Sequence, residues 1–297
     1  MEKRKKLFYH KVVPKFIREP LRHHDIRKSI LQYYNNLPED LINEEEKAII
    51  NYLKNNRLSV FPYSFQENYK PKGIKVYRDK KLKLKYILFD GKKLYFRRKS
   101  SKRGVKRGFH YLQVEQDINS PHRYLTDKFN IKNDDILVDV GAAEGNLALS
   151  VIDKVKKVYL FETNENWIEA LEATFAPWRD KVEIINKFVS DKNDEKTVSL
   201  DQFFQDKEKF TFLKIDAEGA EASILNGCKT LLSSNTPLKI AVCSYHKPHD
   251  GQQLNELLIK KGFSTSFSKG YMIFNDPEFT LSPPYLRKGV IRAEKKI

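Results

Sequence analysis

Apolar residues in the second half of the chain follow two alternating patterns. Short, continuous apolar runs are separated by longer segments in which apolar residues recur every three or four positions. The runs predict buried strands over 136–140, 157–161, 182–189, 211–215 and 238–243. The segments between them predict helices over 146–152, 165–175, 218–232 and 251–261. Strands that alternate with helices are typical of a mostly parallel sheet covered on both faces, so we expect the α/β class.

Two further apolar runs, 263–267 and 271–274, lie on either side of Lys269 and Gly270. Their spacing predicts an antiparallel hairpin, and its position after the last parallel strand places it at the C-terminal edge of the sheet.

The first part of the chain has a different pattern. Acidic residues open an amphipathic stretch that predicts a helix over 38–53, and two short apolar runs around Asp90-Gly91 predict a β-hairpin over 86–96. Residues 97–107 lack apolar periodicity, which predicts a mobile loop. We therefore predict two parts, a basic N-terminal region over 1–119 that contains a helix and a hairpin, and an α/β domain over 120–297.

Charge is distributed unevenly between these parts. The 297-residue chain has a formal net charge of +16, but residues 1–130 hold 32 basic and 14 acidic side chains, which leaves 23 and 25 for residues 131–297. Residues 70–107 alone hold 17 basic and two acidic side chains. Because the α/β half is nearly neutral, the positive charge indicates an anionic partner or location for the N-terminal region rather than the chemistry of the α/β half.

Composition also excludes several classes of protein. A chain with 40% hydrophobic residues can form a sizeable core, so it is not a disordered chain, and no apolar run reaches the roughly 20 residues of a membrane-spanning helix. Basic residues interrupt the apolar stretch after Met1, so no signal peptide is predicted. Cys228 and Cys243 lie in apolar surroundings, which favours two buried thiols over a disulfide or zinc site, and a cytoplasmic location is expected.

The turn after the first parallel strand is a candidate cofactor loop. It reads Val138-Asp-Val-Gly-Ala-Ala-Glu-Gly-Asn146, and its two glycines permit close approach of the backbone to a ligand. A dinucleotide site would require a third glycine, and Glu144 would place a carboxylate beside the phosphates. S-adenosylmethionine has no phosphate and carries a sulfonium and an ammonium, so acidic residues at this turn favour that cofactor.

Carboxylates also follow the other strands of the predicted sheet. Glu162 and Asp216 come directly after two strands, where Glu162 is placed to accept hydrogen bonds from ribose hydroxyls, and Asp191 follows the third strand, where it is placed to accept from the adenine amino group. The alternative is that these side chains cap the helices that follow.

Five motifs together carry a resemblance to a known family. They are Asp139-Val-Gly-Ala-Ala-Glu-Gly145, Leu160-Phe-Glu-Thr163, Phe188-Val-Ser-Asp191, Ser199-Leu-Asp-Gln-Phe-Phe204 and Leu213-Lys-Ile-Asp-Ala-Glu-Gly-Ala-Glu221. In order and spacing the chain resembles FkbM-type methyltransferases over about 120–274. The resemblance implies a class I methyltransferase (Rossmann-like) fold, S-adenosylmethionine as cofactor, and oxygen methylation of sugars or natural-product hydroxyls.

The resemblance and the position of the loop give a candidate cofactor set. Its members are Asp139, Gly141, Ala142, Glu144, Gly145, Asn146, Glu162, Thr163 and Asp191. Of these, Asp139 and the two glycines match the family's contacts to the methionine end, Glu162 its ribose ligand and Asp191 its adenine ligand. Many members have Asn where this chain has Ala143.

The acceptor side is predicted from histidines and charged residues near the same edge. His246 follows the fifth strand, so it is the candidate base that takes the hydroxyl proton, with Asp216 beside it as the second catalytic candidate. The weaker alternative is His249. Candidate substrate-binding residues are His122, Arg123, Glu218 and Arg287, with Arg292 as a further option. A divalent metal held by Asp216, Glu218 and His246 is a less favoured alternative.

Three interpretations remain open for the basic residues 70–107. The first is a surface that recruits an acidic glycan or a lipid-linked sugar at the inner membrane leaflet, aided by a weak apolar anchor. That anchor would consist of Leu7, Phe8, Val12, Val13, Phe16 and Ile17. The second is nucleic-acid binding, because Tyr77, Tyr86, Tyr95 and Phe96 alternate with the cations, and the third is a solvated face.

The main hypothesis is therefore an S-adenosylmethionine-dependent O-methyltransferase that acts on a sugar hydroxyl of a glycan or related natural product. The alternatives are an RNA methyltransferase that uses the basic region, and a non-catalytic binding protein on a methyltransferase-like fold.

Overall fold

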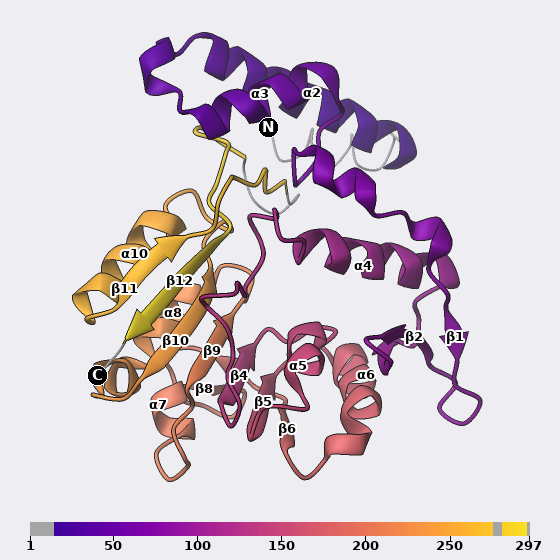
Figure 1. Ribbon diagram of the computed structural model, residues 1–297, viewed down its shortest axis with the longest axis vertical. Helices are drawn as coiled ribbons and strands as arrows, with labels where there is room; N and C mark the ends of the chain where they lie inside the picture. Colours follow the sequence, from indigo (N-terminus) through magenta and orange to yellow (C-terminus); the bar gives the residue numbers. More distant parts are fainter. Residues whose placement is uncertain (1–14, 276–280, 296–297) are drawn as a thin grey trace.

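A seven-stranded sheet forms the centre of the computed structural model, which describes residues 15–275 and 281–295 (Figure 1). Its strands are β4 (Ile136–Val140), β5 (Lys157–Phe161), β6 (Val182–Ile185), β9 (Phe212–Ile215), β10 (Leu238–Cys243), β11 (Ser264–Phe267) and β12 (Val290–Lys295). The strand order is β11-β12-β10-β9-β4-β5-β6. Neighbours from β10 to β6 are parallel, and β12 is antiparallel to both β10 and β11. This is the α/β fold with an antiparallel C-terminal edge that the sequence predicts.

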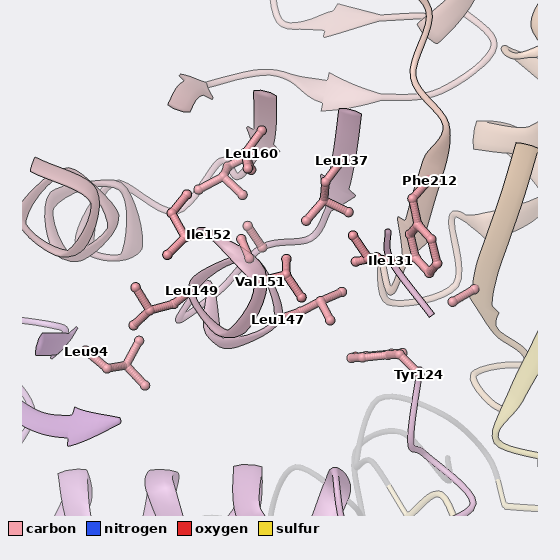
Figure 2. Packing of buried hydrophobic residues seen from close by; sticks show 14 of the residues in the cluster. Leu94, Tyr124, Ile131, Leu137, Leu147, Leu149, Val151, Ile152, Leu160 and Phe212 are labelled. Carbon is pink, nitrogen blue, oxygen red and sulfur yellow. The ribbon is translucent and has the colours of Figure 1, made fainter. Parts of the chain in front are cut away.

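Alternate residues of each strand supply two separate cores. On β4 and β5, Leu137 and Leu160 point to one face, while Val138 and Phe161 point to the other, as the two-residue period of a strand requires. The first face packs on α5 (Asn146–Val151) and α6 (Glu165–Phe175), and Figure 2 shows its side chains around α5. The second face packs on α7 (Leu200–Phe203), α8 (Glu221–Asn226), α9 (Lys229–Ser233) and α10 (Asp250–Lys260).

Two predicted elements of the α/β half differ from those observed. The predicted helix over 218–232 is interrupted between α8 and α9, because Gly227 passes so close to Ser190 that a Cβ would lie 1.9 Å from its carbonyl oxygen. The predicted partner of β11 was 271–274, but β11 pairs with β12 instead, while Met272 forms a single bridge with Arg287.

The predicted third strand is also divided. Residues 182–185 form β6 of the main sheet, whereas β7 (Phe188–Val189) pairs with β8 (Thr197–Val198) in a separate two-stranded sheet.

The N-terminal region contains two long helices and a small sheet. The helices are α2 (Lys15–Asn35), which the sequence did not predict, and α3 (Glu44–Asn55), which begins six residues later than the predicted helix. Asn43 and Glu46 form a capping box that fixes this start.

Short 3-10 turns lie at η1 (Glu39–Leu41), η2 (Ser64–Asn68), η3 (Pro71–Gly73) and η4 (Ala176–Trp178), the last after α6. The small sheet consists of β1 (Tyr77–Arg78), β2 (Lys85–Phe89) and β3 (Lys92–Phe96), and β2 and β3 form an antiparallel hairpin over the segment where one was predicted.

The prediction of a mobile loop over 97–107 was wrong. Helix α4 (Lys102–Glu115) begins inside that segment, with the Ser101 hydroxyl accepting from the Gly104 amide as its N-cap. Its apolar stripe starts at Val105 and continues to Phe109 and Leu112, so only the first of these residues lay in the segment that was judged aperiodic.

The N-terminal region is packed into the α/β half. Phe61, Ile87 and Leu94 belong to the same buried cluster as Leu137 and Leu149 of the central sheet and α5. Helices α2 and α3 pack on Ile273 and Leu286 of the β11–β12 connection, and Figure 1 shows the two helices side by side above it. A domain boundary between 119 and 120 stays a prediction, while the buried core extends across it.

Other expectations concern the membrane and the thiols. Within the described ranges, no helix combines the length and the apolar composition that crossing a bilayer requires. Cys228 and Cys243 are buried, unpaired thiols, as predicted. The suggested anchor residues Leu7, Phe8, Val12 and Val13 lie outside the described residues, as do the side chains of Phe16 and Ile17.

Candidate functional site

A cavity of about 370 Å³ lies at the carboxyl ends of β4, β5 and β9. The strand order reverses between β4 and β9, which is where open α/β sheets bind their ligands. The lining residues are Val140, Gly141, Ala143, Phe161, Glu162, Thr163, Asn164, Trp167, Lys187, Phe188, Val189, Asp216, Ala217, Glu218, Ala220 and Ile224. Its volume lies within the roughly 300–1,000 Å³ of small-molecule sites.

The loop after β4 is held in its shape by backbone contacts. Gly141 has φ +76°, and a Cβ there would lie 2.0 Å from the carbonyl oxygen of Asp216. Gly145 has φ +73°, and a Cβ there would lie 2.7 Å from Leu171 of α6. Ala143 also has a positive φ, +45°, between the two glycines. The loop therefore lies directly against β9 and α6, and Gly141 and Ala143 line the cavity.

Glu162 connects two walls of this cavity. Its Oε2 accepts from the amide of Ala143 at 2.9 Å, and its Oε1 accepts from the amides of Thr163 and Asn164 at 2.8 Å each. The carboxylate is thus fixed between the loop after β4 and the start of α6, at the position from which the sequence predicts a contact with ribose.

Asp139 does not line the cavity. It is buried in an ion pair with Lys214, its partner on β9, whose Nζ lies 2.8 Å from Oδ1 and also donates to the carbonyl oxygen of Gly141. Burial raises the pKa of Asp139, and the Lys214 ammonium opposes that shift. Through Lys214 the pair supports the cofactor loop at Gly141, and the predicted contact of Asp139 with the methionine end stays a prediction.

Several other predicted cofactor residues lie outside the cavity lining. Thr163 lines the cavity, but Ala142, Glu144, Gly145, Asn146 and Asp191 do not. Asp191 follows β7, which is not part of the main sheet, and it accepts a hydrogen bond from Ser223 at 2.8 Å. Burial raises the pKa of Glu144 to about 7. The cofactor contacts predicted for these five residues stay predictions.

His246 does not line the cavity itself, but its Nε2 lies 3.6 Å from carboxylate oxygens of Asp216 and Glu218, which do. It is 1% exposed, and its Nδ1 lies 2.9 Å from Oε1 of Glu221, which is equally buried. The same oxygen accepts from the amides of Ala217 and Gly219, so Glu221 fixes both the imidazole and the turn after β9. Nε2 of His246 lies 3.6 Å from Oδ1 of Asp216.

Asp216 is surrounded by hydrogen-bond donors. The hydroxyls of Tyr124 and Tyr245 donate to its two oxygens at 2.8 and 3.2 Å, and Nε2 of His122 lies 3.5 Å from Oδ2. Burial opposes ionisation, but His122 and nearby Lys214 and His246 hold the pKa of Asp216 well below its usual range. It is therefore a permanent anion at the edge of the cavity.

The same contacts act on the two histidines. Burial alone would lower the pKa of His246, but the hydrogen bond and negative charge of Glu221, with a contribution from Asp216, raise it above its usual value. Burial would also lower the pKa of His122, but the hydrogen bond to Asp216 and the negative charges of Glu115 and Asp216 together raise it. Burial raises the pKa of Tyr124 and of Tyr245 well above the usual value, so both remain hydroxyl donors.

The predicted arginines support the backbone around the site. The buried Arg287 donates to the carbonyl oxygens of Tyr245 and His246 at 2.7 and 2.8 Å. Arg123 donates to the carbonyls of Leu125 and Gln116, and Arg292 to those of Tyr124 and Arg123. These guanidinium groups hold the loops that carry the histidines, while the buried Nη2 of Arg287 has no hydrogen-bond partner in the described part of the chain. The predicted substrate contacts of Arg123, Arg287 and Arg292 stay predictions.

Glu218 lies at the mouth of the cavity. It lines the cavity with φ +50°, its side chain is 81% exposed, and its Oε2 lies 3.6 Å from Nε2 of His246. His122, by contrast, is buried behind Asp216 and contacts the Tyr245 hydroxyl at 3.1 Å.

Three side chains offer ligand atoms for a metal ion. Within the described ranges, ligand atoms of Asp216, Glu221 and His246 lie within 4.8 Å of one another, with Glu221 in place of the predicted Glu218. Oε1 of Glu221 already accepts from two amides and lies 2.9 Å from Nδ1 of His246. Oε2 of Glu221 and Nε2 of His246 are buried and have no hydrogen-bond partner among the described residues, so both atoms keep lone pairs that an ion can use.

Sequence reasoning missed four residues of this site. Tyr124 and Tyr245 are neighbours of predicted residues, and Glu221 and Lys214 belong to the most specific motif, but none was given a role. The signal for Glu221 was the second acidic residue of Asp-x-Glu-Gly-x-Glu, since Gly219, at φ +91°, turns the chain so that the later glutamate faces inward.

Comparison with known proteins identifies a family that the chain matches. A family model described as the methyltransferase FkbM domain matches residues 94–271. No curated protein matches the chain.

Solved structures with a similar course of the chain include three methyltransferases. A methyltransferase FkbM from Methylobacillus flagellatus KT is 15% identical with a TM-score of 0.45, over 66% of this chain and 55% of that one. A precorrin-6y C5,15-methyltransferase from Geobacter metallireducens is 11% identical with a TM-score of 0.39, over 67% and 94%. An rRNA methylase from Streptococcus thermophilus is 16% identical with a TM-score of 0.38, over 56% and 89%. The chain thus spans little more than half the length of the first of these.

Proposed function

Since the chain belongs to the FkbM methyltransferase family, we propose that it transfers a methyl group from S-adenosylmethionine to a hydroxyl of a sugar in a glycan or related natural product. The observation that carries the proposal is His246, a buried imidazole whose Nδ1 is held by Glu221 and whose Nε2 faces Asp216 at the cavity edge. A histidine fixed by a carboxylate on one nitrogen is suited to take a proton at the other.

The cavity has the features that this cofactor requires. Glu162 presents a carboxylate fixed by three amides, and Trp167 and Phe188 supply aromatic surface. Gly141 lets the loop pass against the carbonyl oxygen of Asp216, where a Cβ would clash at 2.0 Å. Asp216 adds a permanent negative charge at the same edge, which favours a cationic ligand. These residues would hold the cofactor, which when bound supplies an electrophilic methyl group.

The chain's own residues then perform two tasks. The acceptor oxygen must be held about 3–3.5 Å from the methyl carbon, which the residues at the mouth, including Glu218, are placed to do. Nε2 of His246 takes the hydroxyl proton, while Glu221 retains the hydrogen on Nδ1 and Asp216 stabilises the imidazolium that forms. Because His246 must be neutral to act and its pKa is raised, turnover should increase with pH.

RNA methylation is the second candidate, and the 17 basic residues over 70–107 favour it. Part of this charge is already used within the fold. Lys92 pairs with Asp153 and Arg98 with Glu169, while Arg97 lies over the ring of Trp167. Of the aromatic residues that alternate with the cations, Tyr95 and Phe96 are buried, whereas Tyr77 is 39% exposed. These contacts support a sugar acceptor over a nucleic acid.

The proposal also includes a location in the cytoplasm. Two buried thiols fit a reducing cytoplasm, and an acceptor built on a lipid would bring the enzyme to the inner membrane surface.

Transfer of a labelled methyl group to fractionated cell material tests the proposal. Incubation with labelled S-adenosylmethionine should label the glycan fraction, and calorimetry should detect binding of S-adenosylhomocysteine that is lost in Glu162→Ala. Label confined to RNA would replace the proposed acceptor with the second candidate. Cofactor binding without transfer to glycans, lipids or RNA would identify a non-catalytic binding protein, and absence of cofactor binding by the wild type would refute the proposal as a whole.

A further inference from the structure

A second cavity lies in the N-terminal region, on the side of α4 that carries Phe109 and Gln113. Its volume is about 420 Å³, and it is enclosed by residues 68–77, by β2 and by α4. The polar and aromatic lining residues that the argument uses are Asn68, Tyr69, Lys70, Lys75, Tyr77 and Gln113. None of the residues that line the cofactor cavity belongs to this set, so the two sites are distinct.

The lining of this second cavity is cationic. Lys70 and Lys75 contribute two ammonium groups, and no lining residue is acidic. Among residues 15–275 and 281–295, neither lysine has a carboxylate within ion-pairing distance. Other cations of the same region, such as Lys92 and Arg98, do have such partners. The cavity therefore combines concave shape with positive charge that the fold itself leaves uncompensated, which suits an anionic ligand.

An aromatic surface lies beside these charges. Tyr77 stacks on Tyr86 with ring centroids 5.4 Å apart and an interplanar angle of 20°, which fixes the ring while 39% of Tyr77 stays exposed. Leu88, which is 51% exposed, extends the apolar surface. An immobilised flat ring next to amides and cations can pack on the C–H face of a pyranose while its substituents form hydrogen bonds.

The adjoining surface favours a saccharide over a nucleic acid. A neighbouring hollow of about 780 Å³ shares Asn68 with the cavity and is lined by five asparagines together with Tyr52, Tyr63 and one carboxylate, that of Glu67. Its lining contains neither lysine nor arginine. A nucleic-acid strand needs cations along its whole path to neutralise successive phosphates. Amide groups next to aromatic rings instead match the closely spaced hydroxyls of a sugar chain.

Helix α4 connects this cavity to the catalytic edge. Phe109 and Gln113 line the cavity, and two residues further on Glu115 lies close enough to His122 and Asp216 to act on their charges. Tyr69, another lining residue, donates to Asp117 in the turn that leads to His122.

We propose that the cavity of Lys70, Lys75 and Tyr77 binds an acidic sugar unit of a polymeric acceptor, at a distance from the hydroxyl that is methylated. The inference rests on the proposed function, because it specifies the substrate class as an anionic polysaccharide. It predicts that chain recognition and methyl transfer are separable.

Binding to an array tests the site. The full-length protein is applied to acidic oligosaccharides bearing uronate, sialate or phosphate groups, to neutral oligosaccharides of equal length, and to RNA oligonucleotides. Acidic saccharides should be retained, and calorimetry on the strongest of them should show that the Lys70→Ala, Lys75→Ala double variant loses affinity by about tenfold or more. Tyr77→Ala should lose about fivefold through the missing ring contact. Lys80→Ala removes an exposed lysine of the same region outside the cavity, and its affinity should match the wild type.

Several results would overturn the inference. These are failure to retain any acidic saccharide, equal retention of neutral ones, an unchanged affinity in the double variant, or tighter binding of RNA with the same dependence on the two lysines. Melting temperature and S-adenosylhomocysteine affinity report on folding and on the cofactor site, and both should be unchanged in the variants. Retention of acidic saccharides without methyl transfer would refute the proposed function alone.

Discussion

The cofactor edge of the sheet and the basic N-terminal region differ in the sign and in the burial of their charged side chains. At the sheet edge, Asp139, Asp216 and Glu221 are buried or nearly so, and each contacts a partner at a fixed distance. In the N-terminal region, most of the 17 cations over 70–107 are exposed. Net charge is therefore a poor guide to the reaction, since the acids that define the site lie in the half of the chain that is nearly neutral.

The two regions meet on α6. Arg97 lies over the ring of Trp167 with its guanidinium carbon 4.6 Å from the centroid, and Arg98 pairs with Glu169. Trp167 also lines the cofactor cavity. The end of the basic hairpin thus supports one wall of the site, and the family match, which begins at residue 94, includes this segment.

Replacing a buried charge should have the largest effect. Lys214→Met leaves Asp139 as a buried anion without its partner, so we expect a loss of unfolding free energy of about 3–5 kcal/mol. Chemical denaturation measures this. In the basic region, Lys80→Met should change the free energy of unfolding by no more than about 0.5 kcal/mol. Similar losses in both variants would remove the distinction between the two regions.

Changing the backbone conformation of the cofactor loop should have the second largest effect. Gly141→Ala forces a Cβ against the carbonyl of Asp216 at positive φ, so we expect a loss of about 3 kcal/mol and weakened cofactor binding. Gly73→Ala is the matched control in the basic region, because nothing lies within 4 Å of its Cβ position. A Gly141→Ala variant with wild-type stability and affinity would contradict the placement of the loop.

The pH dependence of turnover reports on Glu221. With Glu221 ionised, the pKa of His246 lies above its usual value of about 6.5, so turnover should rise with pH through a midpoint above that value. Glu221→Gln removes the negative charge, lowers the pKa of His246, moves the midpoint to lower pH, and reduces the maximal rate by about tenfold because the imidazole is less firmly oriented. An unshifted profile would mean that His246 is not the titrating base.

Neutralising exposed cations should have the smallest effect. Lys80→Gln combined with Lys81→Gln should leave the free energy of unfolding within about 0.5 kcal/mol and cofactor affinity unchanged. Thermal melting and calorimetry check both quantities. A larger loss of stability would show that the surface charge of the N-terminal region contributes to the fold.

The central strands could be predicted because their signal is local. Continuous apolar runs gave the bounds of β4, β5 and β10 as the structure has them, and a parallel sheet brings their ends together. Strand β12 was missed because Arg292 and Glu294 alternate with its buried residues, and its pairing with β10 depends on a contact about 50 residues away in sequence.

The candidate site could be predicted in part. Asp216 and Glu162 were found because each directly follows a strand, and His246 because it lies three residues after β10, so the topology brings all three to the same edge. The role of Glu221 depends on how the turn at Glu218 and Gly219 directs the chain, and that of Lys214 on its register with Asp139 across the sheet. Neither follows from the spacing along the sequence.

The most direct test of the account separates chemistry from cofactor binding in His246→Ala. The account predicts that the rate of methyl transfer falls by about 100-fold or more, as expected for loss of a general base, while the affinity for S-adenosylhomocysteine stays within about twofold of the wild type. Unchanged turnover, or equal loss of turnover and affinity, would contradict the assignment of His246 as the base.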